Sequence, residues 1–449
     1  MIGLLAAMLT LVGAACTIPR APLVSPTTAI VDATVLDVRD GTWRPHRTVL
    51  VEGTRIKEVG ASADVVVPAS ARVLLASGGY VIPGLWDMHT HLTSYGPHLR
   101  QFLAHGVTGV RDMGSLTFEE TQDTVAVAPR QRGLDEILRV RQEIADGRTL
   151  GPRIVTAGVT LNGPLPRGVD LPFQWIVDTP AEATRAVEEL ASRGVDFIKV
   201  HQRLSRASYD AIAAQANVRG LAVAGHVPSA TGIAHVVRAG QASIEHVHGM
   251  AEYVRDTPED RDGQALMGLL REHGTFHVPT LASFQGFVVA SEWYGTPERE
   301  PRMAHLPPPV FRLWKLFYPP EAVVQAPVRE IVAEKTRFTR MLHAGGVPLM
   351  AGTDLGGPFV FAGASLHDEL ELLVRAGLSP LEALQAATLS PATFLNRTDV
   401  GAIESGTLAD IVLLNADPLE DISHTRRIAA VIANGQLFDR DALAQLARH

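Results

Sequence analysis

Short apolar runs alternate with amphipathic segments through the middle of the chain, from about residue 83 to 397. Each repeat begins with a Val/Ile/Ala-rich run that predicts a buried strand, followed by a polar loop and by a helix that ends near a glycine. Eight such strands are predicted, over residues 81–89, 107–112, 153–160, 195–201, 221–227, 243–248, 275–281 and 347–354. Apolar strands alternating with helices indicate an α/β fold with a covered parallel sheet, and eight of them indicate a (β/α)8 TIM-type barrel.

Two of the linking helices have recognisable boundaries. Thr179 can cap a helix over 180–193, and Pro180 suits the first turn of that helix. A second helix, over 330–343, stops at the pair Gly345-Gly346. These signals support the alternation of strands and helices along the middle of the chain.

Both ends of the chain have a different pattern, of short strands and tight turns. We expect strands over 29–36, 47–52 and 55–59 near the N-terminus, and over 411–414 and 428–433 near the C-terminus. The turn signals are Asp40-Gly41, Glu52-Gly53-Thr54 and Asn434-Gly435. Residues 27–82 and 398–440 are therefore expected to form one small composite β-sandwich domain, with the barrel over 83–397 between them.

The first 16 residues have the order of a leader for export. An apolar stretch over 2–12, too short to span a bilayer, is followed by small residues and then by Cys16. Residues 1–16 are thus expected to be the signal peptide of a periplasmic protein, or a lipoprotein leader with a lipid anchor at Cys16. Gly13 stands where lipoproteins usually have leucine, and no Lys or Arg precedes the stretch. A buried N-terminal segment of a cytoplasmic protein is therefore the alternative.

Composition excludes several classes of protein. The chain has 449 residues, of which 46% are hydrophobic and 20% charged, and it contains one cysteine. This apolar content is too high for a disordered protein, and a disulfide scaffold would need paired cysteines. The formal net charge of -8 comes without a basic cluster, so nucleic acid is not an expected partner. We expect a small-molecule substrate and a homo-oligomer.

Metal-type ligands stand at the C-terminal ends of five predicted strands. His89 and His91 end the first strand, and residues two apart in a strand point to the same side, so both imidazoles can bind one metal. Lys199 ends the fourth strand among apolar residues, where a buried ammonium is costly unless it is paired or chemically altered. The fifth, sixth and eighth strands end in His226, His246 and Asp354. Each residue alone has a structural explanation, but together they indicate a metal centre at one end of the barrel.

In this order the ligands resemble those of the amidohydrolase superfamily, and most closely its imidazolonepropionase-like and Xaa-Pro dipeptidase-like metal-dependent hydrolases. The segment VIPGLWDMHTH at 81–91 is similar to the family's entry into its first strand, and GVRDMG at 109–114 to its second strand. Near the C-terminus, GTLADIVL at 406–413 and DPL at 417–419 are similar to its return into the β domain. The resemblance covers nearly the whole chain after the leader.

The resemblance implies two divalent metal ions, most often Zn2+, bridged by a carboxylated lysine and a water or hydroxide. By position, His89, His91 and Asp354 would hold the more buried ion, and His226 and His246 the other. Lys199 would be N-carboxylated and would bridge both ions, because carboxylation turns a buried cation into an anion. The metal-bound hydroxide would attack an amide or peptide C–N bond, with Asp354 as general base and then general acid.

Two features bear on the substrate, which we expect to be a dipeptide or an N-acyl amino acid. A long segment over 282–328 carries eight aromatic residues. It is expected to be a loop that favours a bulky apolar or aromatic substrate, or one that packs on the barrel or in an oligomer contact. The free carboxylate of such a substrate needs a cation, although polar residues line every barrel mouth. The candidate residues for this contact with the carboxylate are His201, Arg203, His248, His277 and Arg111.

Two other functions remain open at this point. A metal-dependent lactonase, esterase or carbamate hydrolase would use the same ligands. A non-enzymatic binding protein would normally have lost some of them, and here the set is complete. The sequence therefore favours a metal-dependent hydrolase that acts on carbon–nitrogen bonds.

Overall fold

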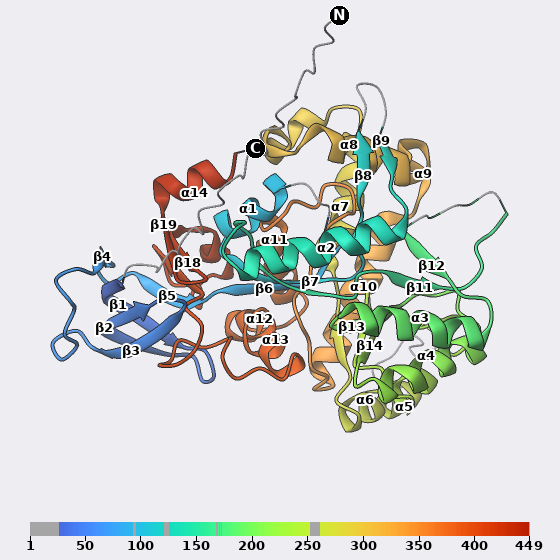
Figure 1. Ribbon diagram of the computed structural model, residues 1–449, viewed down its shortest axis with the longest axis horizontal. Helices are drawn as coiled ribbons and strands as arrows, with labels where there is room; N and C mark the ends of the chain where they lie inside the picture. The colour runs from blue at the N-terminus through green and yellow to red at the C-terminus, as the bar shows by residue number, and fades with distance from the viewer. Residues whose placement is uncertain are drawn as a thin grey trace, which may run out of the picture.

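The computed structural model describes residues 27–92, 96–120, 125–167, 169, 171, 173–251 and 261–448 of the chain. The leader expected over 1–16, with Cys16, lies outside these residues. Figure 1 shows a strand-rich part built from both ends of the chain, in blue and red, beside a larger part in which strands and helices alternate.

Both ends of the chain contribute to one eight-stranded sheet. Its strands run in the order β19-β18-β17-β5-β1-β2-β3, and β4 pairs with β1 in addition. The strands are β1 (Thr28–Asp37), β2 (Thr42–Glu52), β3 (Arg55–Ala61), β4 (Arg72–Leu75), β5 (Tyr80–Pro83), β17 (Ile411–Leu414), β18 (Ile428–Ala433) and β19 (Gln436–Asp439). The strands predicted over 411–414 and 428–433 are therefore confirmed to the residue.

Two hairpin turns of this sheet meet. Asn434 and Gly435, between β18 and β19, have positive φ angles of 49° and 77°, as the tight turn signalled by their sequence requires. A Cβ atom on Gly435 would lie 1.9 Å from the carbonyl oxygen of Gly53, in the turn between β2 and β3. The sheet is therefore curved enough to bring these two turns into contact. This curvature is the only feature of the expected β-sandwich that the described residues show.

Nine further strands form two parallel sheets, in the orders β10-β7-β6 and β12-β11-β13-β14-β15-β16. They are β6 (Leu85–Thr90), β7 (Val107–Asp112), β10 (Arg153–Thr156), β11 (Thr160–Asn162), β12 (Gln174–Ile176), β13 (Phe197–Val200), β14 (Ala222–Gly225), β15 (Ser243–Glu245) and β16 (Phe276–Val278). A short antiparallel pair consists of β8 (Phe118–Glu120) and β9 (Val125–Val127). Each of the first seven predicted strands overlaps a parallel strand, and the third is divided into β10 and β11.

The eighth predicted strand, over 347–354, does not form a regular ladder. Leu349 makes a single parallel bridge to His277 of β16, and Leu355 makes one to Thr90 of β6. Because β16 and β6 are edge strands of the two parallel sheets, this segment lies between the sheets. Its position agrees with the prediction, and only its regular pairing is missing.

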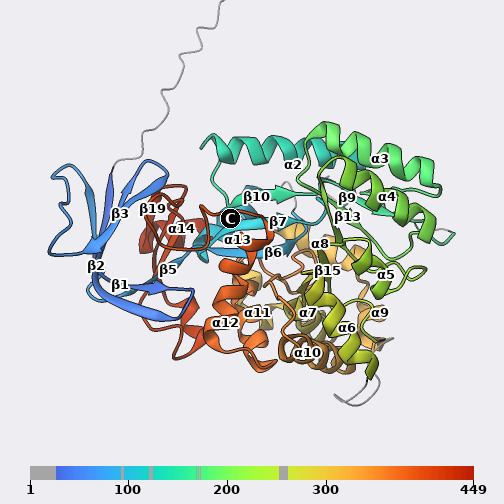
Figure 2. The same ribbon diagram turned by 90° about the horizontal axis from the view of Figure 1, so that it is seen from below.

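Helices pack on both sides of the parallel strands (Figure 2). Helix α3 begins with a capping box between Thr179 and Glu182 and ends at Gly194, whose φ is 79°. The helix predicted over 180–193 is thus confirmed to the residue. The helices outside segment 281–344 are α1 (Gly96–Ala104), α2 (Arg130–Ala145), α3 (Pro180–Arg193), α4 (Arg206–Val218), α5 (Ile233–Arg238), α6 (Arg261–Glu272), α11 (Ala364–Arg375), α12 (Pro380–Ala386), α13 (Leu389–Phe394), η3 (Ile422–Arg426) and α14 (Arg440–Leu446).

The prediction of a loop over 282–328 is wrong, because the segment is mostly helical. Its elements, with the helix that follows, are α7 (Leu281–Trp293), η1 (Pro297–Arg299), η2 (Pro301–His305), α8 (Pro308–Phe317), α9 (Pro320–Gln325) and α10 (Val328–Ala344). The prolines stand in the first turns of these helices, where the missing N–H group is tolerated. Trp314, which is 2% exposed, and five other aromatic side chains of the segment form a cluster with Phe359 and Phe361. We call 281–325 the helical insert.

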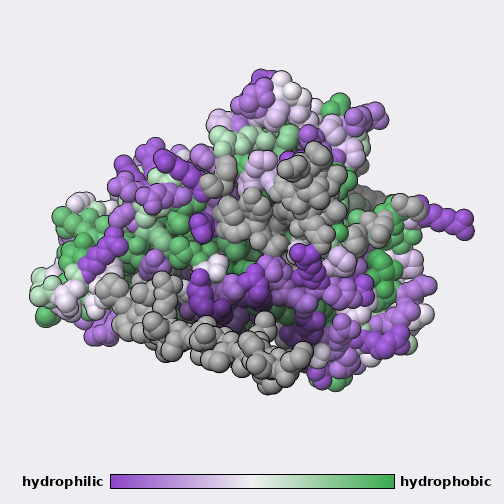
Figure 3. Space-filling model, turned by 45° about the horizontal axis from the view of Figure 1, so that its top comes forward, coloured by the Kyte–Doolittle hydropathy of each residue, from purple (hydrophilic) through white to green (hydrophobic). Residues whose placement is uncertain are grey.

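The surface in Figure 3 mixes hydrophilic and hydrophobic residues, and apolar residues are visible at the end that carries the terminal sheet. Val66, Val73 and Leu75 are exposed in that part of the chain. None of the described helices has the length and the apolar character needed to cross a bilayer.

Candidate metal centre

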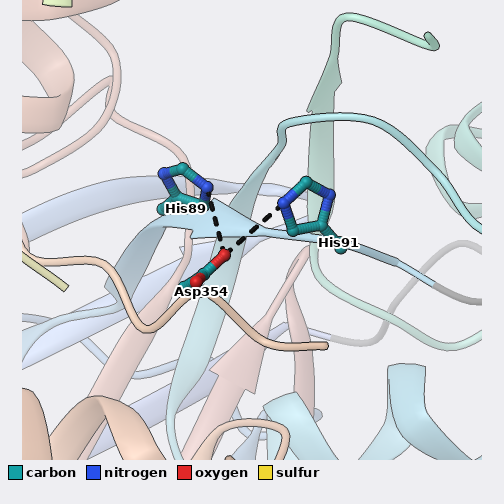
Figure 4. Close-up of side chains that lie close together, drawn as sticks. All are labelled: His89, His91 and Asp354. Carbon is teal, nitrogen blue, oxygen red and sulfur yellow. Dashed lines mark ion pairs between the residues drawn. The ribbon is translucent and has the colours of Figure 1, made fainter. Parts of the chain in front are cut away.

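Three of the predicted ligands converge where β6 meets segment 347–355. The Nε2 atoms of His89 and His91 lie 3.3 and 3.5 Å from the same oxygen, Oδ1 of Asp354, as Figure 4 shows. The backbone N–H of Asp354 donates to the carbonyl oxygen of His89 at 2.7 Å, which holds the two segments side by side. The three ligand atoms lie within 4.8 Å of one another, so one ion can bind all of them.

The second nitrogen of each imidazole is held by the protein. Nδ1 of His89 lies 2.7 Å from Oε2 of Glu245, and Nδ1 of His91 lies 2.8 Å from the carbonyl oxygen of Gly114. With Nδ1–H donating to these oxygens, the Nε2 lone pairs of both rings point toward Asp354. Metal-binding histidines are usually oriented by such a partner.

Glu245 and Arg111 form a buried ion pair next to His89. One guanidinium nitrogen of Arg111 lies 2.9 and 3.0 Å from the two carboxylate oxygens of Glu245, and another donates to the hydroxyl of Ser243 at 2.9 Å. Both charged side chains are 0% exposed. Burial would raise the pKa of Glu245, but the charge of Arg111 and the hydrogen bond from His89 lower it below its usual value. Glu245 is therefore an anion that orients His89.

The other predicted ligands, Lys199, His226 and His246, lie beside this group. The ring centroid of His246 lies 4.6 Å from that of His89 and 4.9 Å from that of His226. Within the described part of the chain, the amine of Lys199 and Nδ1 of His226 are buried without a hydrogen-bond partner. Because buried polar atoms are normally paired, these two atoms call for a ligand of another kind.

Protonation states also suit a metal centre. Burial lowers the pKa of His226 and that of His246 well below the usual value. Burial alone would raise the pKa of Asp354, but the surrounding histidines, His246 first, hold it well below its usual value. Neutral imidazoles and an ionised carboxylate are the forms that bind metal ions.

The pKa of Lys199 is shifted by the same surroundings. Burial lowers it to about 8, although the charges of Glu245 and Asp354 oppose the shift. A larger fraction of this amine than of an exposed lysine is therefore neutral near neutral pH, and a neutral amine can be carboxylated. The donor set of His89, His91 and Asp354 fits one metal ion, and the orphaned atoms of Lys199 and His226 lie beside it.

Strained backbone marks the residues around the centre. His246, Thr280 and Asp354 have positive φ angles of 60°, 53° and 58°. This conformation costs a non-glycine residue about 1–3 kcal/mol and is concentrated at functional sites. The hydroxyl of Thr280 lies 2.7 Å from Nδ1 of His246, and the hydroxyl of Ser283 donates to Oδ2 of Asp354 at 3.0 Å. The start of α7 thus supports two of the predicted ligands.

Two of the residues proposed as cations for substrate contact, His201 and His248, lie close to the centre. His201 and His248 pack on His226, with ring centroids at 4.0 and 5.1 Å. Burial lowers the pKa of His201 to about 3 and lowers that of His248 as well, so both rings are neutral at neutral pH. Arg203 is exposed beyond the end of β13.

Arg111 and His277 do not fit the expected substrate contact, because both are 0% exposed. Arg111 instead neutralises Glu245, and His277 lies within β16. Sequence reasoning missed Glu245, Thr280 and Ser283. Glu245 could have been found, since it is an acidic residue in a short apolar strand directly before His246. The roles of Thr280 and Ser283 depend on contacts with distant strands and leave no local signal.

Comparison with known proteins identifies a family whose model matches this chain. The family model described as "Amidohydrolase family" matches residues 80–438. The match begins at β5 and ends in β19, so it contains every residue of the candidate metal centre.

Relatives match this chain over most of their length. An uncharacterized protein of Mycobacterium tuberculosis is 26% identical over 405 residues, which make up 87% of this chain and 91% of that protein. Ochratoxinase of Aspergillus niger is 24% identical over 479 residues, with 93% of this chain and 89% of the enzyme covered. Among solved structures, a prolidase-like protein of Bifidobacterium longum has a TM-score of 0.73 and 27% identity, covering 94% of this chain and 99% of its own.

Proposed function

The chain belongs to the amidohydrolase family and is a hydrolase that acts on carbon–nitrogen bonds, and from this premise we propose that it cleaves the amide bond of a dipeptide or an N-acyl amino acid. The observation that carries the proposal is the convergence of His89, His91 and Asp354 beside the orphaned amine of Lys199. The prolidase-like relative supports a peptide-type substrate.

The proposed cofactor is a pair of divalent metal ions, with Zn2+ as the first candidate. The residues that would hold the ions are His89, His91, Lys199 as its N-carboxylate, His226, His246 and Asp354. Such ions lower the pKa of a bound water towards about 7 and polarise a carbonyl group. The orphaned amine of Lys199 supports its carboxylation, because a buried ammonium beside ligands for cations is unfavourable.

Asp354 is the residue proposed to move the proton. Its Oδ2 accepts a hydrogen bond from the hydroxyl of Ser283, while Oδ1 is the oxygen nearest the two imidazoles. Because Asp354 is ionised, it can take a proton from the attacking water and pass it to the leaving amine nitrogen. Glu245 keeps the proton of His89 on Nδ1 through this transfer.

We propose that a bulky apolar or aromatic group of the substrate enters an apolar pocket next to His91. The pocket has a volume of about 20 Å3, so its lining must move apart to admit the group. Its apolar lining includes Leu313, Trp314 and Phe317 of α8 and Leu355 from the segment after Asp354. An aromatic group in this pocket would lie beside the metal centre. The helical insert would thus form a wall of the substrate site.

Metal analysis of the wild-type protein and of Lys199→Ala tests the centre. We expect stoichiometric divalent metal in the wild type, and in Lys199→Ala a loss of metal and of activity. Lys57→Ala is the matched control, because Lys57 is an exposed residue that pairs with Glu52 at 3.1 Å. A wild type without stoichiometric metal, or a fully active Lys199→Ala, would contradict the proposal.

A substrate panel tests which bond is cleaved. It should contain N-acyl amino acids, Xaa-Pro and Xaa-hydrophobic dipeptides, esters, lactones and carbamates. We expect the highest kcat/KM for an amide with an aromatic group. Faster hydrolysis of the esters, lactones or carbamates would assign the centre to one of those bonds instead.

We also propose that the parallel strands close into a (β/α)8 barrel over 83–397. The bridges from segment 347–355 to β16 and to β6 support closure on one side. On the other side, β10 pairs with β7 of one sheet and β11 pairs with β13 of the other. Only three residues separate the end of β10 from the start of β11. Residues 27–82 and 398–440 would then form the β-sandwich domain.

A further inference from the structure

Lys335, on α10, is a cation close to the metal centre. Its side chain is half-buried, and its ammonium lies 5.5 Å from the ring centroid of Phe284. The ring of Phe284 lies 6.4 Å from that of His246, measured between centroids. One aromatic side chain therefore separates Lys335 from a proposed metal ligand.

Lys335 also acts on a second histidine of the centre through its charge. Burial lowers the pKa of His248, and the positive charge of Lys335 lowers it further. The ring of His248 lies 5.1 Å from that of His226, which is another proposed ligand. The contacts of Phe284 with Lys335 and with His246 place the ammonium on this side of the centre.

This ammonium has no anion to balance it within the described part of the chain. Its ring contact is with Phe284, and the neighbouring Glu334 acts on it only as a charge. Burial is the larger effect and lowers the pKa of Lys335. A half-buried cation is costly without a partner, so its position is best explained by an anion that arrives with a ligand.

Lysine is rare in this chain, and Lys335 differs from the other lysines in its surroundings. Only 4 of the 40 basic residues are lysines, at positions 57, 199, 315 and 335. Lys57 and Lys315 are exposed, and Lys57 pairs with Glu52. The two lysines that are not exposed are Lys199, which is buried and a proposed metal ligand, and Lys335, which is half-buried near the same centre.

We propose that Lys335 binds a free carboxylate of the substrate beside the amide to be cleaved. This inference rests on the proposed function and narrows its substrates to dipeptides and N-acyl amino acids that keep a free carboxylate. The apolar pocket borders His91, whereas Lys335 lies across the ring of Phe284 from His246. One substrate can therefore place its bulky group and its charge at separate subsites.

A matched pair of substrates isolates the charge: an N-acyl-phenylalanine and the same compound as its carboxamide. For Lys335→Met we expect kcat/KM of the free acid to fall about tenfold to hundredfold, mainly through KM, because a charge-assisted contact is lost. The kcat/KM of the carboxamide should stay within about twofold of wild type. Lys335→Arg, which keeps the charge, should recover part of the loss.

Lys315→Met is the control for the chemical change itself. The ammonium of Lys315 also lies near a phenylalanine ring, 4.7 Å from the centroid of Phe311, but the side chain is exposed. Both substrates should be cleaved by this variant as by the wild type. Thermal unfolding of each variant confirms that the comparison is made between folded proteins.

Calorimetric binding of N-alkyl analogues of the free acid and of the carboxamide, which have no amide bond to cleave at that position, gives a readout without turnover. We expect Lys335→Met to weaken binding of the acid about tenfold or more and to leave the carboxamide unaffected. Equal losses for both compounds, no loss for the acid, or no binding of the acid to the wild type would overturn the role of Lys335. Binding of the acid that depends on Lys335, in a protein that hydrolyses neither N-acyl compound, would overturn the proposed function and leave the carboxylate site standing.

Discussion

At the scale of single residues, Glu245 connects the buried charge of Arg111 with the ligand His89. Replacing Glu245 by glutamine leaves Arg111 buried without an anion. We therefore expect Glu245→Gln to lower the free energy of unfolding by about 3–5 kcal/mol. Because His89 loses its orienting partner, metal affinity should fall about 10- to 100-fold. Urea unfolding and metal titration measure the two effects separately.

Glu404→Gln is the control for this substitution. Glu404 pairs with Arg39 on the surface, and its side chain is 50% exposed. Its loss should change the free energy of unfolding by no more than about 1 kcal/mol and leave metal binding unchanged. If Glu245→Gln were equally mild, the buried pair would not support the centre in the way we describe.

The candidate ligands could be predicted from the sequence because their signal is local. His89 and His91 share one strand, and Lys199 stands among apolar neighbours in another. Lys335 could not be singled out in this way. Its significance arises only when side chains from distant strands and helices come together, and its sequence surroundings do not report those contacts.

At the scale of elements, α8 contributes Phe317 to the apolar pocket beside His91. We expect Phe317→Ala to lower kcat/KM for aromatic substrates about tenfold or more relative to small ones, since apolar pockets discriminate by about that much. Steady-state kinetics with paired aromatic and small N-acyl amino acids measures the ratio. Leu316→Ala is the control, because Leu316 is the next residue and is 55% exposed. An unchanged ratio in Phe317→Ala would remove the insert from the substrate site.

Helix α11 supports the start of α7 through Glu369. Its Oε2 accepts the backbone N–H of Ala282 at 2.7 Å, while Oε1 has no partner among the described residues. Burial raises the pKa of Glu369 from 4.5 to about 8, although the N–H groups of Ala282 and Leu281 oppose the shift. The carboxyl group is therefore largely protonated at neutral pH in the folded protein.

This shift predicts a pH dependence of stability. Between about pH 5 and 8 the folded state holds a proton on Glu369 that the unfolded state has released, so stability falls as the pH rises. Glutamine imitates the protonated form and does not titrate. Relative to Glu369→Gln, the wild type should lose up to about 4–5 kcal/mol across this range. Urea unfolding of both proteins at several pH values gives the difference, and a difference independent of pH would contradict the assignment.

The elements themselves were predicted unevenly, for physical reasons. Helix α3 and strands β17 and β18 have strong caps or strict apolar patterns, and their bounds agree with the sequence prediction. The sequence predicts a loop over most of the helical insert. In the structure its prolines begin helices, and the aromatic side chains that bury the insert contact Phe359 and Phe361, beyond the segment. Tertiary packing therefore decided what the local pattern could not.

At the scale of the whole molecule, hydrogen bonds link the eight-stranded sheet, built from both ends of the chain, to the parallel strands. Arg153 of β10 donates to Asp410 at 2.7 Å and to Asn434 at 2.9 Å, and both partners belong to the C-terminal return. Strand β5 leads directly into β6, which carries His89. The sequence predicted that the two ends would meet. It did not predict these contacts, because they join residues more than 250 positions apart.

The candidate ligands come from β6, β13 to β15 and segment 347–355. Removing a metal ion that they bind should therefore lower the stability of the whole fold. A ligand present at about 100 times its dissociation constant stabilises the folded state by about 2.7 kcal/mol. We expect a chelator to lower the Tm of the wild-type protein by a few degrees and added Zn2+ to restore it. In Asp354→Ala, which lacks the carboxylate shared by His89 and His91, the chelator should have little effect. Differential scanning calorimetry with and without chelator makes the comparison, and an equal shift in both proteins would place the stabilising metal elsewhere.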